Sequence, residues 1–455
     1  MKLTQTLFCA AALAAAAFGQ AKEKPPAGGP PKAFTIPARE TFTLKNGMKV
    51  SLVPYGTMPV AALSARIAFG NANESASEVW LSDLMWALMK EGAGKRNGIQ
   101  LAEEAARLGG QLNAGAGLDS SQAGIQVLSE FAPDAVRLLA DVLRRPTFPA
   151  SELERLRADL LRRLTVELAQ PQPLADQAFA KALYGDHPYG RVYPTEANLK
   201  SYTLEQVRRH FQANLGARRT HLYVVGRFPA SLKQAISAAF EDWAPGPEVV
   251  RHPPRTTARH QFVLVDRPGA EQSTLRIGLP IAASPTHADY IPMVVADNLL
   301  GGSFGSRITA NIREQKGYTY SPYSAVAVNY HSAYWYENAD VTTKVTADSI
   351  KEIYAEINRL RQEPPPEEEL QGIRAYTAGL FVLRNSSPRG IINQLSFVDT
   401  QGLPDSYLNS YVQKVNAVTR SDVQRLAETY LDPAKLVVVV VGDKAAIEGS
   451  LKAYK

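Results

Sequence analysis

Cysteine and histidine are scarce in this sequence. One cysteine, Cys9, and seven histidines occur among 455 residues. Beyond Cys9 the chain can form no disulfide, offers no thiol nucleophile and cannot bind a metal through cysteine. No two histidines are three or four residues apart, which excludes a helix that presents two imidazoles to one metal ion. A metal site made by this chain alone is therefore not expected.

Long apolar runs and clusters of positive charge are also missing. The chain has 50 Lys and Arg residues and 44 Asp and Glu residues, which gives a net charge of +6 and a pI near 9.1. The basic residues are interspersed with acidic ones, and no basic run carries interleaved aromatic residues. Nucleic acid is therefore not an expected partner.

A continuous apolar run of the kind found in signal peptides, Leu7–Phe18, lies at the N-terminus. It is too short to span a bilayer as an anchor. Lys2 precedes it and small residues up to Ala21 follow it, an arrangement typical of a secretory signal peptide. We expect cleavage after residue 21, a periplasmic or secreted protein, and no membrane span after cleavage. The Pro-, Gly- and Lys-rich start of residues 22–38 predicts a tether.

The second half of the chain repeats the first. Thr203 opens a helical pattern that leads to an apolar strand ending at Gly226, and Thr419 and Gly442 have the same relation at the same spacing. We predict an α+β fold of two homologous domains, each a mixed or antiparallel sheet packed with helices. The predicted parts are the N-terminal domain 39–245, a linker 246–260 and the C-terminal domain 261–455.

Local patterns predict individual elements. Asn46-Gly47 between two strand-like runs is a strong hairpin signal. Trp80–Gly92 has apolar residues at helical spacing, and Ile291–Leu300 matches it in the second half. Ser151 followed by Glu154 predicts a capping box at the start of a long helix.

Five segments carry a family resemblance: LKNGMKVSLVP, LGGQLNAGAGLDSS, LYGDHPYGR, LLGGSFGSRITANIREQKGYTYS and the terminal VVVVVGD. With them the chain resembles the insulinase/pitrilysin family of zinc metallopeptidases. It is most similar to the short bacterial members related to the mitochondrial processing peptidase. The resemblance implies that the two domains form half of a clam-shell chamber.

The zinc motif of that family is missing here. In active members the helix that matches Trp80–Gly92 carries H-x-x-E-H, in which two histidines bind zinc and the glutamate activates water. The three matching positions hold Asp83, Trp86 and Ala87. Near the position of a further glutamate ligand the chain has Arg162-Arg163, whose charge would oppose a divalent cation. We therefore expect no metal or other cofactor in this chain, and zinc in a partner subunit.

The resemblance assigns roles to residues of the second domain. Arg313 and Tyr320 keep the family spacing; Arg313 would hold the substrate backbone and Tyr320 would donate to the developing oxyanion. Tyr318 competes for the tyrosine role. Arg313 could instead be a solvated helix residue, and Tyr320 could be an amphipathic strand residue. The stretch Gly301-Gly302-Ser303-Phe304 would contact substrate, as such loops do in some non-catalytic subunits. Its glycines could alternatively let a helix end turn tightly.

These features predict a non-catalytic subunit of a heterodimeric zinc metallopeptidase, inactive alone. A homologous partner with H-x-x-E-H would supply the metal, and this chain would donate Arg313 and Tyr320 in trans. The substrates would be unfolded peptides that add a strand to a sheet edge, for which Gln111–Ser121 is the candidate region. The alternative is a proteolytically inactive scaffold or peptide-binding protein of the same fold. A third possibility, an active peptidase with an unrecognised metal site, conflicts with the histidine pattern.

Overall fold

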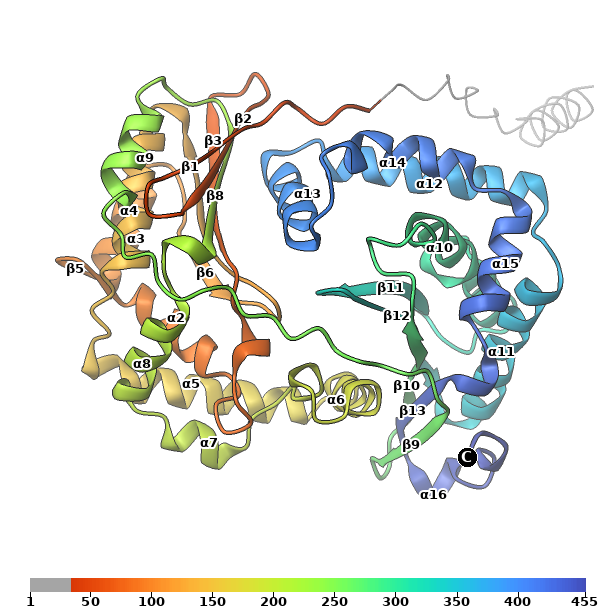
Figure 1. Cartoon of the computed structure of the whole chain (residues 1–455). Coiled ribbons are helices and arrows are strands. Elements are labelled where there is room, and N and C mark those ends of the chain that lie inside the picture. Colours follow the sequence, from red (N-terminus) through yellow and green to blue (C-terminus); the bar gives the residue numbers. More distant parts are fainter. Residues whose placement is uncertain (1–33) are drawn as a thin grey trace, which may run out of the picture. The chain divides into compact units, whose positions relative to one another are not determined.

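The computed structural model describes residues 34–455. The predicted signal peptide, residues 1–21, and residues 22–33 of the predicted tether lie outside the described residues. Residues 35–455 cluster into one compact unit, which contains two main sheets and the helices packed on them (Figure 1).

The first sheet has six strands in the order β1-β2-β8-β3-β7-β6. Its strands are β1 (Glu40–Thr43), β2 (Lys49–Pro54), β3 (Val60–Ile67), β6 (Asn113–Ala116), β7 (Ser121–Leu128) and β8 (Thr220–Gly226). Strands β2 and β8 are parallel, and the other neighbours are antiparallel. The predicted hairpin is confirmed: the Asn46-Gly47 turn joins β1 to β2, and Gly47 adopts φ 90°, which glycine tolerates without strain.

The second sheet repeats this arrangement with five strands in the order β9-β13-β10-β12-β11. Its strands are β9 (Gln261–Asp266), β10 (Gln272–Ile281), β11 (Tyr323–Asn329), β12 (Ser332–Thr342) and β13 (Val437–Gly442). The order equals β2-β8-β3-β7-β6, and the one parallel pair, β9 with β13, has the same place. The predicted α+β duplication with mixed sheets is thereby confirmed. A separate two-stranded hairpin consists of β4 (Gly92–Ala93) and β5 (Arg96–Asn97).

The described helices fall into two sets, those before and those after strand β9. The helices before β9 are α2 (Leu81–Lys90), α3 (Gly98–Arg107), α4 (Ala132–Arg144), α5 (Ala150–Leu168), α6 (Pro171–Tyr184), α7 (Glu196–Ser201), α8 (Leu204–Asn214) and α9 (Leu232–Phe240). Those after β9 are α10 (Tyr290–Asp297), α11 (Thr346–Gln362), α12 (Glu367–Arg384), α13 (Pro388–Gln401), α14 (Ser406–Ala417), α15 (Arg420–Tyr430) and α16 (Lys444–Ile447). The predicted helix within Trp80–Gly92 is α2.

Some helical segments are not α-helical. The predicted helix Ile291–Leu300 is only partly α-helical, because α10 continues as π-helical turns, η5 (Asn298–Gly302). A second π-helical segment is η6 (Thr309–Gln315). The 3-10 turns are η1 (Asn71–Asn73), η2 (Ser129–Phe131), η3 (Pro188–Gly190), η4 (Ala217–Arg219), η7 (Thr343–Val345), η8 (Pro433–Lys435) and η9 (Lys452–Tyr454).

Two helix caps agree with the sequence patterns, and one predicted capping box does not form. The side chains of Thr203 and Thr419 both cap the helices that they precede, α8 and α15, in capping boxes. The capping box predicted at Ser151 is wrong. Helix α5 begins at Ala150 with Pro149 as its N-cap, which places Ser151 inside the first turn, and no side chain caps this helix end.

Helices α6 and α13 pack against the sheet of the opposite half of the sequence. Phe179 of α6 packs with Val437 and Val439 of β13 in one apolar cluster, and α13 contacts β3 and β8. On α13, Asp399 accepts a hydrogen bond of 2.5 Å from the Tyr223 hydroxyl of β8. The two halves are therefore joined through a reciprocal exchange of corresponding helices.

Two further predictions concern the segments Gln111–Ser121 and 246–260. Strand β6, inside the predicted region Gln111–Ser121, is an edge strand of the first sheet. Residues 246–260, the predicted linker, contain neither helix nor strand. Among the helices of residues 34–455, none has both the length and the apolar character to cross a membrane.

Candidate functional site

The helix that matches the zinc-binding helix, α2, is fixed at its N-terminus by a buried acid. Glu74 accepts hydrogen bonds from the backbone N–H groups of Trp80 (3.0 Å) and Ser82 (2.7 Å). Burial raises the pKa of Glu74 to about 7, although these hydrogen bonds oppose the shift. The Ser82 hydroxyl lies 2.9 Å from Nε2 of His210, a buried histidine whose pKa desolvation lowers to about 4. His210 thus supports α2 as a neutral, hydrogen-bonded residue.

Asp83, the first of the three motif positions, forms an ion pair with Arg163 of α5. The Arg163 guanidinium donates to Asp83 Oδ1 at 3.0 Å, and Asn71 Nδ2 donates to Oδ2 at 2.9 Å. Arg163 also donates to Glu167 at 2.7 Å and lies 4.3 Å from the ring centre of Trp80. The side chain of Asp83 is 19% exposed and that of Arg163 is 48% exposed. A protein cation therefore occupies the side of α2 where a metal-binding relative would need an unpaired donor.

Only one of the two predicted arginines reaches this position. Arg162 points to solvent and pairs with Asp159 one turn earlier on the same helix. Adjacent helical residues project in directions about 100° apart, so the two side chains cannot both face α2. The opposing positive charge at the motif comes from Arg163 alone.

The other two motif positions offer no ligand. Trp86 is 1% exposed and belongs to the main apolar core, where its indole Nε1 has no hydrogen-bond partner among the described residues. Ala87 is half-buried and packs against the same core. Trp86 is thus a core residue that fills volume.

These residues do not fit a zinc ion. Structural and catalytic zinc sites need at least three protein donors from His, Cys, Asp or Glu. The motif positions provide one carboxylate, and both of its oxygens already accept hydrogen bonds. Within residues 34–455 no group of three or more such side chains is arranged to hold a metal ion.

Arg313 and Tyr320 lie together at the surface with Phe304. The Arg313 guanidinium carbon is 4.4 Å from the ring centre of Phe304 and 5.0 Å from that of Tyr320. Phe304 is 70% exposed and Tyr320 is 80% exposed. Arg313 also pairs with its neighbour Glu314 at 3.1 Å. We call Phe304, Arg313 and Tyr320 the arginine–aromatic cluster. The guanidinium contacts two rings, while the rings themselves remain accessible.

Tyr318 differs from Tyr320 in its surroundings. The backbone of Tyr318 is tied to Ile312 and Thr342 by hydrogen bonds, and its side chain is half-buried. Its ring is not among those stacked on Arg313. The contact with Arg313 therefore distinguishes Tyr320 from its competitor.

The structure places the predicted substrate-binding stretch 301–304 at different depths. Gly301 is buried, and a Cβ there would lie 2.5 Å from Ser324 Oγ and 2.7 Å from Glu337 Oε2. Ser303 is buried with an unpartnered hydroxyl, whereas Phe304 is at the surface. None of the glycines at 301, 302 and 305 has a positive φ. Glycine is thus needed at 301 for close approach, and the helical segment η5 ends at Gly302 without a left-handed residue among these glycines.

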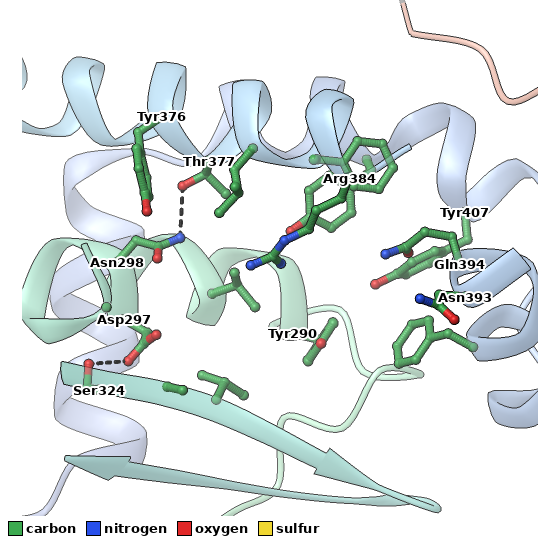
Figure 2. A pocket seen from close by; sticks show the side chains of 18 residues that line it. Tyr290, Asp297, Asn298, Ser324, Tyr376, Thr377, Arg384, Asn393, Gln394 and Tyr407 are labelled. Atoms are coloured by element: carbon green, nitrogen blue, oxygen red, sulfur yellow. Dashed lines mark hydrogen bonds between the residues drawn. The ribbon is translucent and has the colours of Figure 1, made fainter. Parts of the chain in front are cut away.

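Sequence reasoning missed a pair of buried carboxyl groups beneath Gly301. Asp297 accepts hydrogen bonds from the Ser324 hydroxyl (2.5 Å) and from Trp335 Nε1 (2.8 Å); the first is drawn in Figure 2. Burial raises the pKa of Asp297 to about 7. Glu337 is fully buried without a hydrogen-bond partner among the described residues, and burial and Asp297 raise its pKa. The available signal was an aspartate inside the apolar run Ile291–Leu300.

Two family profiles match the chain. The profile described as "Insulinase (Peptidase family M16)" matches residues 53–194, and the profile described as "Peptidase M16 inactive domain" matches residues 201–376. The first covers α2 and the degenerate motif. The second covers the arginine–aromatic cluster.

Curated relatives of similar length also match. An "Uncharacterized zinc protease YmxG" of Bacillus subtilis is 24% identical, over 85% of this chain and 94% of its own length. A "Non-peptidase homolog YmxG" of Helicobacter pylori is 19% identical, over 85% of this chain and 90% of its own length. This chain is thus similar both to a relative named as a zinc protease and to one named as a non-peptidase homologue.

Solved structures share the fold. A peptidase M16 inactive domain from Pseudomonas fluorescens superposes with a TM-score of 0.81 at 24% identity, covering 89% of this chain and 98% of that one. A protease from Helicobacter pylori superposes with a TM-score of 0.83 at 18% identity, covering 90% and 100%.

Proposed function

Because the chain belongs to the M16 (insulinase) family of peptidases and lacks its zinc-binding residues, we propose that it is the non-catalytic subunit of a two-chain zinc peptidase. A homologous partner with H-x-x-E-H would bring the metal chemistry, and this chain would contribute Arg313 and Tyr320 to the shared site. The N-terminal segment 1–21 would direct the chain to the periplasm or the exterior. Its substrates would be unfolded peptides.

The observation that carries this proposal is the contrast between the two candidate sites. At the motif, Asp83 is paired with Arg163 and Trp86 is buried, so neither side chain is free to bind a metal ion. The arginine–aromatic cluster instead presents Tyr320 to solvent, with no hydrogen bond from its hydroxyl within residues 34–455. The free hydroxyl of Tyr320 beside the guanidinium of Arg313 suits an active site whose metal is supplied by a second chain.

The chemistry of the two side chains fits the stabilisation of negative charge. A phenol hydroxyl and a guanidinium are both hydrogen-bond donors. Aimed at a carbonyl oxygen that gains charge during peptide hydrolysis, such donors lower the barrier. Tyr320 would donate to the developing oxyanion, and Arg313 would donate to a neighbouring backbone carbonyl of the substrate.

Peptide binding would use the edge strand β6. One side of β6 pairs with β7, and its other side is the edge of the sheet. An extended peptide can add there as a further strand, with backbone hydrogen bonds supplying affinity. Under this proposal, substrate recognition would lie in the half of the chain that carries the degenerate motif.

The test combines this chain with a candidate H-x-x-E-H partner and measures cleavage of an unfolded peptide. We expect activity in the mixture and a loss of about 100-fold or more in kcat for Tyr320→Phe. Tyr323→Phe is the control, because Tyr323 is also exposed but lies outside the cluster. An active mixture that tolerates Tyr320→Phe would exclude the role in trans, and sensitivity of Tyr318→Phe instead would move that role to Tyr318.

A second candidate function is a proteolytically inactive scaffold or peptide-binding protein. The burial of Trp86 and the pairing of Asp83 favour it equally, because both make α2 a structural element. Under this hypothesis the chain binds peptide or a partner, but mixtures with any H-x-x-E-H subunit cleave no faster than that subunit alone.

A further inference from the structure

Because the fold is duplicated, the motif positions Asp83, Trp86 and Ala87 of α2 have corresponding positions in the second half of the chain. The two sheets have the same strand order, and α2 and α10 follow corresponding strands, β3 and β10. When the helices are aligned by their buried positions, Asp83 corresponds to Val294, Trp86 to Asp297 and Ala87 to Asn298. The helix that faces α2 across the motif, α5, corresponds to α12.

At this counterpart position the structure has an open pocket instead of a filled core. Val294, Asp297 and Asn298 all line a cavity of about 560 Å³ between α10, α12, α13, α14 and β11 (Figure 2). This volume is typical of sites that bind small organic molecules, about 300–1,000 Å³. The large side chain of Trp86 occupies the corresponding place in the first half. The second half therefore has a cavity where the first half has a buried tryptophan.

A single cation and several aromatic rings define one end of this pocket. Arg384 reaches from α12 into the space between Tyr290, Asn298 and Tyr407 (Figure 2). Its guanidinium has no hydrogen-bond or ionic partner among residues 34–455. Burial raises the pKa of Tyr290, and the nearby charge of Arg384 opposes this rise. An unpaired guanidinium in a concave aromatic site is a recognition element for a carboxylate.

The tyrosine at this end also lacks a partner. Tyr407 is 7% exposed, lines the pocket, and its hydroxyl has no hydrogen-bond partner in the described part of the chain. The rings of Tyr290 and Phe397 lie 6.5 Å apart, and those of Phe397 and Tyr407 lie 6.3 Å apart. A buried hydroxyl without a partner costs about 1–3 kcal/mol, which a bound acceptor would recover. The rings provide a wall for an apolar or aromatic side chain.

The opposite end of the pocket supplies an acceptor. Asn298 Nδ2 donates to Thr377 Oγ1 at 3.0 Å, so the amide oxygen of Asn298 is oriented away from that bond (Figure 2). Asp297 is the only acidic residue in the lining, and its Oδ1 is occupied by Ser324 and Trp335. A ligand N–H can therefore be accepted at this end, while the cation lies at the other.

We propose that this pocket binds the C-terminal residue of a peptide, with the free carboxylate on Arg384 and Tyr407 and an apolar or aromatic side chain against the rings of Tyr290 and Phe397. The amide N–H groups of the preceding residues point toward Asn298. This site belongs to the chain alone and requires neither a metal nor a catalytic partner, so its test is independent of the proposed function.

The test measures binding of a tetrapeptide that ends in phenylalanine to the isolated full chain by isothermal titration calorimetry. The peptide is used as the free acid and as the C-terminal amide, with N-acetylphenylalanine as the probe for a small carboxylate. We expect the free acid to bind at least tenfold more tightly than the amide and more tightly than N-acetylphenylalanine. Arg384→Gln should lower affinity at least tenfold, and Arg384→Lys should restore part of it.

Matched variants keep this test decisive. Arg208→Gln removes an exposed arginine outside the pocket, on α8, and should leave the affinity unchanged. Tyr407→Phe keeps the ring and removes only the unpartnered hydroxyl, so it should lower affinity severalfold without destabilising the protein. Equal binding of acid and amide, full affinity in Arg384→Gln, or a preference for N-acetylphenylalanine over the peptide would each overturn the assignment.

Discussion

The guanidinium of Arg163 lies 3.0 Å from Asp83 Oδ1, across two helices whose residues are 80 positions apart in the sequence. Asp83 stands at the first position of the family's zinc motif, and Arg163 lies close to the position from which a further ligand would come. Where the family resemblance leads one to expect metal ligands, this protein has an internal ion pair. The pair holds α2 to α5 and leaves no free donor for an ion.

This ion pair should stabilise the fold measurably. Arg163→Met removes the partner of a largely buried carboxylate and the contact with Trp80. Because Arg163 is nearly half exposed, solvent screening reduces the effect, and we expect a loss of about 1–2 kcal/mol in the free energy of unfolding. Urea denaturation measures it. Arg162→Met is the control and should stay within about 0.5 kcal/mol, because Arg162 forms only an exposed pair on its own helix. Equal effects of the two variants would contradict the account.

The indole of Trp86 should matter for its volume and not for its N–H group. Trp86→Ala opens a large cavity in the main core, so we expect a loss of about 3–5 kcal/mol in unfolding free energy. Trp86→Phe keeps most of the ring volume and loses no hydrogen bond, because Nε1 has no partner in residues 34–455. Its cost should be well under half of that of Trp86→Ala. Equal costs in thermal or urea unfolding would show that the N–H group has a role not visible in these contacts.

Gly301 should not tolerate a side chain, although its φ is unremarkable. A methyl group there would lie 2.5 Å from Ser324 Oγ and 2.7 Å from Glu337 Oε2, so Gly301→Ala should cost about 1–3 kcal/mol through overpacking. Gly305 lies in the same stretch, and a Cβ there would meet nothing within 4 Å. Gly305→Ala should therefore be nearly neutral. Similar unfolding midpoints for both variants would contradict the close approach.

The buried acid Asp297 should make stability fall as pH rises. Its folded-state pKa of about 7 lies above the ordinary value of 3.8, so the native state binds a proton more tightly than the unfolded chain does. The resulting stabilisation is complete below pH 3.8 and is lost as pH rises through 7. Its full size is about 4 kcal/mol from the difference between the two pKa values.

Asp297→Asn tests this pH dependence. The asparagine oxygen can still accept from Ser324 and Trp335, but the group no longer titrates. Between pH 5 and pH 8 the unfolding free energy of the wild type should fall relative to that of the variant. Two parallel curves over this range would show that Asp297 ionises normally.

The sequence predicted what depends on local pattern. The helix α2, the Asn46-Gly47 hairpin, the caps at Thr203 and Thr419 and the duplicated fold all follow from periodicity, turn chemistry and repetition. The capping box at Ser151 failed because α5 begins at Ala150, two residues before the start that a Ser151 cap requires. The Ser151–Glu154 pattern also fits inside the first turn of a helix, so by itself it does not determine where α5 starts.

The sites depend on contacts that no local pattern encodes. The arginine pair at 162–163 was recognised near the motif, but only the packing of α5 on α2 decides that Arg163 faces Asp83. The pocket around Arg384 draws its lining from four helices and a strand. Asp297 was visible as an acid in an apolar run, yet its pairing with Ser324 and Trp335 depends on strand register. Such sites become apparent only when the tertiary structure is known.

The most direct test of the account is the rate of peptide cleavage by this chain alone, by a zinc-loaded H-x-x-E-H partner alone, and by their equimolar mixture, with the zinc content of each chain measured alongside. We predict far less than one zinc ion per molecule and no cleavage for this chain alone, and a rate in the mixture well above that of the partner. One zinc ion per molecule together with cleavage by the isolated chain would contradict the central claim.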